Sequence, residues 1–417
     1  MTDEILTGIA RQYGTPTFVF DTGALKKRLA AIRDIFGPQV KLCYSIKANP
    51  FLIPAALEEA DCLEVCSPGE LAICERLGVD MERVVYSGVN KEPWDVERAV
   101  AEDGVGICTA ESLRHVQLLE KAGEKAGRKV PVLLRLNSGA QFGMSREDLL
   151  QVIRERERYP HLSLEGIHYF AGTQRKNKEL RKQKEELQML RALFAEVKEN
   201  EDFSLRRLEY GPGLPVPLFA DGDYSDTLAP ARELAEALQE ASGWAELTVE
   251  AGRFYAAECG FYLTKVVDSK RVEDKRYCIA DGGINHVNYL GQIMGMKEPV
   301  IRHFRGNGDP DARPEEVTYR RISDAEEDGE ALEDWTICGS LCTTNDDLVR
   351  TRRMAEPRLG DLLVFENLGA YSVTEGIYLF LSRKMPRIVL YNDISDICLV
   401  RDFVDTDPIN TPGNCLV

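Results

Sequence analysis

Residues 40–47 read VKLCYSIK, an apolar, β-rich run that ends at a lysine just before the turn Ala48-Asn49-Pro50. The same pattern recurs along the chain: a short β-rich run, then a polar or glycine-containing turn, then a stretch with helical periodicity. Seven further runs of this kind are CLEVC (62–66), RVVYSG (83–88), VGICTA (105–110), VPVLLRLN (130–137), LEGIHYF (164–170), RRLEYG (206–211) and AELTVEAG (245–252).

Eight strands that alternate with helices predict an α/β fold, a parallel (β/α)8 barrel of the TIM type. A doubly wound open sheet is the alternative arrangement. The longest predicted helix, within residues 179–200, places Leu187, Leu190 and Phe194 on one face, as expected for a helix that covers a barrel. We assign the barrel to residues 25–250.

The pattern changes after about residue 253, where strand follows strand with no long amphipathic helix between them. Runs such as FYLTKVVDSKRV (261–272) and DLLVF (361–365) predict a second domain made of β-strands. The run TFVFD (17–21) precedes the barrel series and is expected to add a strand to that domain. The all-β domain is therefore predicted to be discontinuous, comprising residues 1–24 and 251–417.

Composition narrows the class of protein. The chain has 417 residues, 44% of them hydrophobic and 29% charged, which is typical of a globular protein. Its 52 Lys and Arg against 69 Asp and Glu give a net charge of −17, which disfavours binding to nucleic acid or to an anionic membrane. No apolar run is long enough to cross a bilayer and no signal peptide is recognisable, so a cytoplasmic location is expected.

Cysteine usage gives no indication of a metal site. The chain has 11 cysteines but no CxxC pair, and many of them lie in apolar, strand-like runs where reduced thiols are usually buried. Cys62 and Cys66 are the only close pair that we considered as ligands, and their spacing favours a structural role. We therefore expect no bound metal.

Polar residues gather at the predicted carboxyl ends of the barrel strands, where barrel enzymes have their active sites. Lys47 follows the first strand, the turn Gly211-Pro212-Gly213 ends the seventh, and Glu250, Gly252 and Arg253 end the eighth. Loops after the last two strands often bind phosphate through backbone N–H groups. A lysine, a phosphate cradle and a carboxylate are what pyridoxal 5'-phosphate requires, for covalent attachment, phosphate binding and protonation of the pyridine nitrogen respectively.

The chain resembles the fold-type III pyridoxal-phosphate decarboxylases, which include diaminopimelate and ornithine decarboxylases. The resemblance extends from about residue 15 to about residue 395, with the motifs in family order. These motifs are YSIKANP (44–50), LEVCSPGEL (63–71), SGVNK (87–91), QFGM (141–144), GIHYFAGTQ (166–174), GPG (211–213), EAGRF (250–254), DGGINH (281–286), GSLCTTND (339–346) and GAY (369–371).

The resemblance implies an amino-acid decarboxylase with pyridoxal phosphate as cofactor, and a homodimer in which each active site draws residues from both subunits. Lys47 is then the cofactor lysine, and Cys342 is the residue that helps to protonate the product from the other subunit. The implied cofactor contacts are Glu64, Arg135, Phe170, Thr173, Gly211, Gly213, Glu250, Gly252, Arg253 and Tyr371. The implied substrate contacts are Thr343, Asp346 and His286.

Departures from the family pattern concern the substrate more than the reaction. Diaminopimelate decarboxylases have a glutamate where this chain has Thr343, and an arginine after the DGG segment where this chain reads INHVNYLG (284–291). Without these groups the distal end of diaminopimelate has no charged partner. We therefore expect the substrate to be a non-standard amino acid or amino-acid derivative of a specialised biosynthetic pathway, either free or linked to a carrier. Diaminopimelate in lysine biosynthesis is the alternative.

Two other classes of protein are alternatives to a decarboxylase. Alanine racemases share a lysine-bearing barrel and a β domain, but they pair the pyridine nitrogen with arginine, whereas this chain has Glu250. A binding protein that retained the scaffold without activity would have lost Lys47 or Cys342, and both are present. Cys342 could also be an ordinary core thiol, and His286 a structural loop residue.

Overall fold

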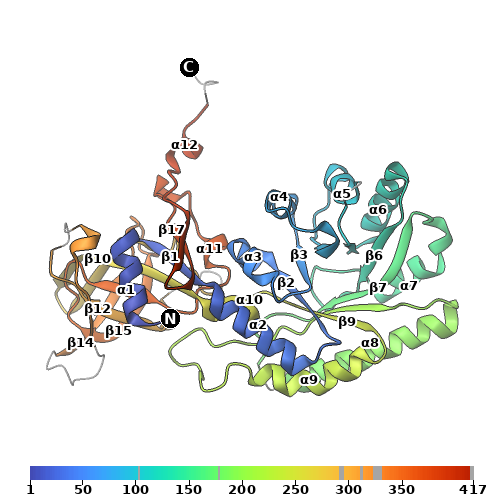
Figure 1. The fold of residues 1–417 in the computed structure, drawn as a ribbon, viewed down its shortest axis with the longest axis horizontal. Coiled ribbons are helices and arrows are strands. Elements are labelled where there is room, and N and C mark those ends of the chain that lie inside the picture. The colour runs from blue at the N-terminus through green and yellow to red at the C-terminus, as the bar shows by residue number, and fades with distance from the viewer. Residues whose placement is uncertain (102–103, 177–178, 291–294, 310–312, 323–330, 414–417) are drawn as a thin grey trace. The chain divides into compact units, whose positions relative to one another are not determined.

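The structure is a computed structural model that describes residues 1–417 apart from 102–103, 177–178, 291–294, 310–312, 323–330 and 414–417 (Figure 1). The chain divides into two compact units. The barrel unit is Lys26–Val216 with Ser225–Tyr255, and the sheet unit is Met1–Leu25 with Pro217–Tyr224 and Ala256–Val417. The segment Pro217–Tyr224 thus groups with the sheet unit, although the sequence analysis placed it inside residues 25–250.

Eight parallel strands close into a barrel in the order in which they occur along the chain, and β9 pairs with β2 to complete it (Figure 1). This confirms the predicted barrel, and the open doubly wound sheet is wrong. Seven of the quoted runs contain a whole barrel strand, and the eighth, LEGIHYF (164–170), covers all but the first two residues of its strand. The strands are β2 (Lys41–Ser45), β3 (Cys62–Val65), β4 (Val84–Tyr86), β5 (Ile107–Ala110), β6 (Val130–Arg135), β7 (Leu162–Phe170), β8 (Arg207–Gly211) and β9 (Glu246–Ala251).

Hydrophobic packing explains why these runs form a barrel. Cys43, Val85, Ile107 and Leu133 form one buried cluster, and Cys62 packs against it. They come from five strands that follow one another around the barrel, so the cluster forms an apolar layer on the part of the barrel wall that these strands make. The polar residues at the carboxyl ends of the same strands therefore lie next to this apolar layer.

Helices follow most of the barrel strands, and several begin at a serine that caps them. The Oγ atoms of Ser67, Ser112 and Ser145 each accept a hydrogen bond from the backbone N–H three residues later. Helices α8 and α9 lie side by side and are joined by the ion pair of Arg191 with Glu240 (Figure 1). The helices between residues 22 and 256 are α2 (Thr22–Phe36), α3 (Ile53–Ala56), α4 (Pro68–Arg76), α5 (Pro93–Val100), α6 (Leu113–Ala126), α7 (Arg146–Arg154), α8 (Leu180–Glu201), α9 (Ala229–Ser242) and α10 (Arg253–Ala256).

The sheet unit is built on one large sheet of mixed strand directions. Its main path runs β13-β12-β16-β10-β1-β17-β18, while β11 pairs with β10 and β14, and β15 with β14. The strands are β1 (Thr17–Asp21), β10 (Gly260–Val272), β11 (Lys275–Ala280), β12 (Ile301–Arg305), β13 (Arg320–Ile322), β14 (Leu332–Cys338), β15 (Asp347–Ala355), β16 (Leu362–Phe365), β17 (Arg387–Asp393) and β18 (Asp396–Arg401). The helices described in this unit are α1 (Asp3–Tyr13) and the one-turn helices α11 (Ser372–Glu375) and α12 (Asp407–Asn410).

The N-terminal segment completes this sheet, as predicted. Strand β1 pairs antiparallel with β10, where Phe18 faces Tyr262, and parallel with β17, where Phe18 faces Ile388. Helix α1, which the sequence analysis did not predict, buries Leu6 and Ile9 in the core of the same sheet. A β domain assembled from both ends of the chain is therefore a feature of the fold.

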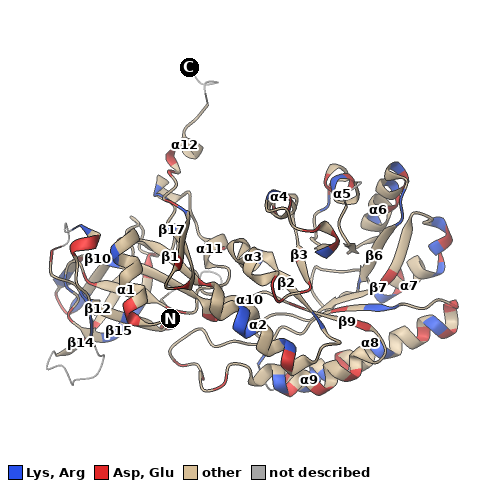
Figure 2. Ribbon diagram, in the orientation of Figure 1, with Lys and Arg blue, Asp and Glu red and all other residues tan. Residues whose placement is uncertain are grey.

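Charged residues are spread over both units. Figure 2 shows Lys and Arg interspersed with Asp and Glu along α8, as expected for a helix with one solvated face. Pairs such as Arg181 with Glu185 lie within single helices. Among the described residues, no helix is both long enough and apolar enough to cross a membrane.

Candidate active site

Lys47 lies in the 3-10 segment Ile46–Ala48, which directly follows β2. Its Nζ donates to Glu64 Oε2 at 2.5 Å and lies 3.8 Å from Glu250 Oε1. The lysine side chain is 36% exposed, whereas the Glu64 and Glu250 side chains are 2% and 3% exposed. The amine is thus held by two buried carboxylates while its side chain stays accessible to a molecule that enters the barrel mouth.

Cys66 is a third neighbour of that amine. Its Sγ lies 3.4 Å from Lys47 Nζ, and the thiol donates to Glu64 Oε1 at 3.1 Å. Burial, followed by the charge of Glu64, raises the pKa of this thiol far above its usual value. Cys66 is therefore a neutral thiol that orients Glu64. The sequence analysis favoured a structural role for Cys66 over metal binding and missed its place beside Lys47.

Glu250 sits at the end of β9 and is contacted by two hydrogen-bonding groups and one charged group from other elements. His168 Nε2 lies 2.8 Å from Glu250 Oε2, Ser45 Oγ donates to Oε1 at 3.2 Å, and the Lys47 amine forms an ion pair with Oε1 at 3.8 Å. Burial alone would raise the pKa of Glu250, but the Lys47 charge and the His168 hydrogen bond outweigh it and leave that pKa well below its ordinary value. Glu250 is thus an anion inside the barrel.

A second carboxyl group in the barrel interior has the opposite state. Glu209 on β8 is buried, and burial together with the negative charge of Glu250 raises its pKa well above the ordinary value, so it is neutral. One ring nitrogen of His168 and one carboxylate oxygen each of Glu209 and Glu250 lie within 4.8 Å of one another. Only Glu250 was given a role from the sequence. His168 was noted only as part of the motif GIHYFAGTQ, and Glu209 was missed, although alternation along β8 places it on the same face as Gly211.

Arg135 and Phe170 occupy neighbouring strand ends. The Arg135 guanidinium pairs with Glu111 Oε1 at 2.9 Å and lies over the ring of Phe142 at 4.9 Å and that of Phe170 at 6.0 Å. A Cβ atom added at Gly211 would come within 2.3 Å of the Phe170 ring. The absence of a side chain at Gly211 therefore allows Phe170 to pack against the end of β8.

The turn Gly211-Pro212-Gly213 is held by the loop after β7 and by α8. Gly213 has φ +66°, and a Cβ there would come within 2.1 Å of the Gly172 carbonyl oxygen. The Arg175 N–H donates to Gly213 O at 2.9 Å, and the buried Gln183 side chain donates to Pro212 O at 2.8 Å. The turn is therefore a crowded backbone cradle in which the carbonyl groups of Pro212 and Gly213 are both engaged.

The remaining phosphate contacts that were predicted lie around this turn or in the other unit. Thr173 is an exposed residue of the loop after β7, and Gly252 and Arg253 directly follow β9, the neighbour of β8. Tyr371 belongs to the sheet unit, where it adopts φ +70° just before α11. The loops after β7, β8 and β9 are thus neighbours in the barrel. Tyr371 belongs to a second group of predicted residues, on the sheet unit.

That second group lies on the sheet unit. Cys342 is exposed on the loop between β14 and β15, Thr343 is half-buried beside it, and Asp346 is buried. Asp346 accepts hydrogen bonds from the N–H groups of Ile284 and Leu341 at 2.8 and 2.7 Å. Through these contacts Asp346 ties the loop that carries the exposed Cys342 to the segment of Ile284.

His286 does not present a free nitrogen for a substrate. It is 2% exposed, its Nδ1 lies 2.8 Å from Tyr262 Oη, and its Nε2 lies 3.2 Å from the Lys384 carbonyl oxygen. Burial lowers the pKa of His286 to about 4. His286 was predicted to contact the substrate. In this structure it has a packing role instead, because both of its ring nitrogens are engaged by the protein.

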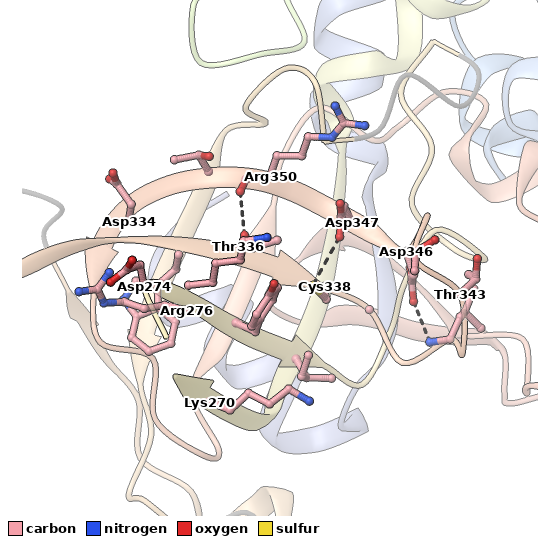
Figure 3. Close-up of a pocket in the computed structure, with 18 residues that line it drawn as sticks. Lys270, Asp274, Arg276, Asp334, Thr336, Cys338, Thr343, Asp346, Asp347 and Arg350 are labelled. Carbon is pink, nitrogen blue, oxygen red and sulfur yellow. Dashed lines mark hydrogen bonds between the residues drawn. The ribbon is translucent and has the colours of Figure 1, made fainter. Parts of the chain in front are cut away.

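A cavity of about 810 Å³ opens beside Thr343 and Asp346 in the sheet unit (Figure 3). Figure 3 shows two hydrogen bonds between β14 and β15 along it, Thr336 Oγ1 to Arg350 O at 2.9 Å and Cys338 Sγ to Asp347 Oδ1 at 3.5 Å. Its lining includes Lys270, Asp274, Arg276, Asp334 and Arg350, so both signs of charge are present. The residues around Lys47 are not part of it.

A family profile described as "Pyridoxal-dependent decarboxylase, pyridoxal binding domain" matches residues 22–257, more than half of the chain. The chain belongs to the pyridoxal-dependent decarboxylase family. This confirms the resemblance to the fold-type III decarboxylases, and the protein is an amino-acid decarboxylase of that type. The racemase and the inactive binding protein are therefore set aside.

Individual relatives agree with the family but differ in substrate. An "L-glutamyl-[BtrI acyl-carrier protein] decarboxylase" of Niallia circulans is 26% identical, covering 92% of this chain and 90% of that protein. A diaminopimelate decarboxylase of Aquifex aeolicus is 24% identical, covering 98% and 94%. The crystal structure of diaminopimelate decarboxylase from M. jannaschii shares the fold with a TM-score of 0.83, at 20% identity and 99% and 95% coverage.

The hold of Gln183 on the cradle is testable. Replacing Gln183 by leucine keeps the helix but removes the donor to Pro212 O, and the dissociation constant of pyridoxal phosphate should rise about 5- to 20-fold. Titration of the apoenzyme, followed by visible absorbance, measures it. Gln188→Leu, an exposed position on the same helix, serves as the control. Equal affinities for the two variants would show that Gln183 does not support the cradle.

Proposed function

We propose that the protein removes the α-carboxylate of an amino acid whose side chain is joined to a larger group, such as an aminoacyl group on a carrier protein, within a specialised biosynthetic pathway. The observation that carries this proposal is the nature of residue 343. Diaminopimelate decarboxylases use a glutamate at that place, by the resemblance described above, and this chain has Thr343. The segment after Gly283 also contains no arginine before residue 302.

Charge complementarity explains why these two changes disfavour diaminopimelate. The distal end of that substrate carries an ammonium and a carboxylate, and both lose strength of binding when no opposite charge faces them. An amino acid extended through an amide or thioester has neither charge at that end. The Niallia circulans relative is named for a glutamyl group on an acyl-carrier protein, which supports a substrate of this kind.

The residues around Lys47 fit pyridoxal phosphate. Lys47 would hold it covalently, the anionic Glu250 would face the ring nitrogen, and Phe170 would contact the ring. The phosphate would be bound by the cradle of Gly211, Gly213, Gly252 and Arg253, together with Thr173 and Tyr371. The bound cofactor supplies an electron-accepting ring for the electron pair that remains when CO₂ leaves.

The chain's own residues would prepare and complete that reaction. Glu64 Oε2, at 2.5 Å, is positioned to take a proton from Lys47 Nζ, because an amine must lose its charge before it acts as a nucleophile. Glu250 would keep a proton on the ring nitrogen, since a buried anion favours the protonated partner. Cys342 would deliver the proton to the former α-carbon.

We propose further that the enzyme acts as a homodimer. Lys47 and Glu250 belong to the barrel unit and Cys342 and Thr343 to the sheet unit. The family resemblance implies that a subunit's Cys342 serves the active site of the other subunit. The exposed position of Cys342 on a loop fixed by Asp346 supports this assignment, because a thiol that reaches a partner must be displayed at the surface.

A CO₂-release assay with a defined set of substrates tests the proposal. The panel contains meso-diaminopimelate, lysine, ornithine, free L-glutamate, γ-L-glutamyl pantetheine and the same glutamyl group on a phosphopantetheine carrier protein. We expect kcat/KM for an extended substrate to exceed that for meso-diaminopimelate by at least about 100-fold. A preference for meso-diaminopimelate would overturn the proposal, and change of optical rotation without CO₂ would show racemisation.

The variant Thr343→Glu tests whether residue 343 determines the choice of substrate, on which the proposal rests. Restoring a carboxylate at residue 343 should raise kcat/KM for meso-diaminopimelate by about 10-fold or more and leave that for the extended substrate equal or lower. Thr344→Glu, at the exposed neighbouring position, controls for the added charge. If both variants respond alike, residue 343 does not contact the distal end of the substrate.

A further inference from the structure

His168 is placed to act on Glu250 rather than on the substrate. It lies on β7 and Glu250 on β9, two strands that are separated by β8 in the barrel wall. Their side chains meet inside the barrel, where His168 Nε2 and Glu250 Oε2 are 2.8 Å apart and both side chains are at most 3% exposed. Such a buried charge-assisted contact fixes the orientation of a carboxylate.

The hydrogen-bonding pattern determines which nitrogen of His168 carries the proton. An ionised carboxylate only accepts hydrogen bonds, so Nε2 must be the donor to Glu250. Nδ1 is buried and has no hydrogen-bond partner among the described residues. The pattern therefore matches a histidine with its proton on Nε2, aimed at Glu250.

The importance of this donor grows when Lys47 is engaged. In the structure Lys47, Ser45 and His168 together stabilise the Glu250 anion. Once the Lys47 amine is committed to the cofactor, its full positive charge no longer faces Glu250. Ser45 and His168 still donate to Glu250, and the neighbouring Glu209 is a neutral acid that adds no competing charge.

We propose that His168 is a positioning residue that holds the Glu250 carboxylate, through Nε2–H, in the orientation needed to bind the protonated ring nitrogen of pyridoxal phosphate. The inference rests on the proposed role of Glu250. It assigns to His168 a function that is separate from ring contact, which is expected of Phe170. It also explains why the polar side chain of His168 is buried beside the two acids Glu209 and Glu250.

Three variants test the role of His168. His168→Leu removes the donor, His168→Gln places an amide N–H near the position of Nε2, and His161→Leu removes a similar contact elsewhere, since His161 Nδ1 lies 2.7 Å from Glu120 Oε1. We expect His168→Leu to lower kcat about 10- to 100-fold and to shift the visible absorbance of the bound cofactor. His168→Gln should recover kcat to within about 5-fold of wild type, and His161→Leu should change neither quantity.

The outcomes separate this inference from the role of Glu250. Wild-type kcat and spectrum in His168→Leu would overturn the inference, as would a Gln variant as impaired as the Leu variant, because that result indicates packing alone. If Glu250→Gln is also without effect, the role of Glu250 fails as well. Should His168→Leu not fold, as judged by its melting temperature, the His168→Gln variant decides: a wild-type spectrum supports the proposal and a shifted one contradicts it.

Discussion

Replacing Lys47 by alanine is expected to abolish the visible absorbance of the purified enzyme and to lower kcat by at least roughly 10⁴-fold. The reason is geometric, because Lys47 combines an accessible side chain with an amine held by the buried Glu64 and Glu250. Excess pyridoxal phosphate should not restore the absorbance. The measurement is a visible spectrum of the protein after removal of free cofactor, together with a CO₂-release assay.

Lys41→Ala is the matched control for this variant. Lys41 begins the same strand, β2, and is 54% exposed with Glu246 as a distant partner at 4.0 Å. It should bind the cofactor and turn over like the wild type. If Lys47→Ala retained the absorbance band of the wild type, the cofactor would be attached elsewhere and the assignment of Lys47 would be wrong.

The second large effect is expected at Glu250. Glu250→Gln keeps the shape of the side chain but removes the charge that Lys47, His168 and Ser45 stabilise. A neutral amide cannot keep the ring nitrogen protonated, so kcat should fall about 10²- to 10³-fold while the cofactor remains bound. Steady-state kinetics and the cofactor content of the variant give both quantities.

Glu246→Gln, on the same strand but exposed, shows what loss of a surface charge does alone. It should leave kcat within a factor of about two, because exposed charges contribute little. An active Glu250→Gln enzyme with wild-type kcat would mean that the ring nitrogen does not depend on this carboxylate. Loss of bound cofactor, with kcat restored at high cofactor concentration, would give Glu250 a binding role only.

The barrel was predictable because its strands are apolar on both faces and separated by clear turns. Strand β4 (Val84–Tyr86), for example, is buried at every position. The strands that sequence reasoning missed in the sheet unit lack this pattern. Strand β18 (Asp396–Arg401) alternates between exposed and half-buried residues, and β15 (Asp347–Ala355) carries three arginines. Helix α1 was missed because its burial depends on a sheet assembled from distant segments.

The candidate site was predictable to the same extent. Lys47 and Glu250 stand out in the sequence because each is a charged residue at the end of an apolar strand. The partners Ser45, Cys66 and His168 do not, because their importance comes from contacts that the barrel creates between strands. Alternation along each strand could have placed them on the interior face, but only the closed barrel brings them to one carboxylate.

Reduction of the holoenzyme with borohydride, followed by peptide mapping, tests the central claim most directly. Reduction makes the attachment of pyridoxal phosphate permanent, and mass spectrometry of the peptides then locates it. The account predicts that the label lies on Lys47. A label on Lys91, the buried barrel lysine whose Nζ donates to the carbonyl groups of Ser87 and Gly88, or on any other lysine would contradict it.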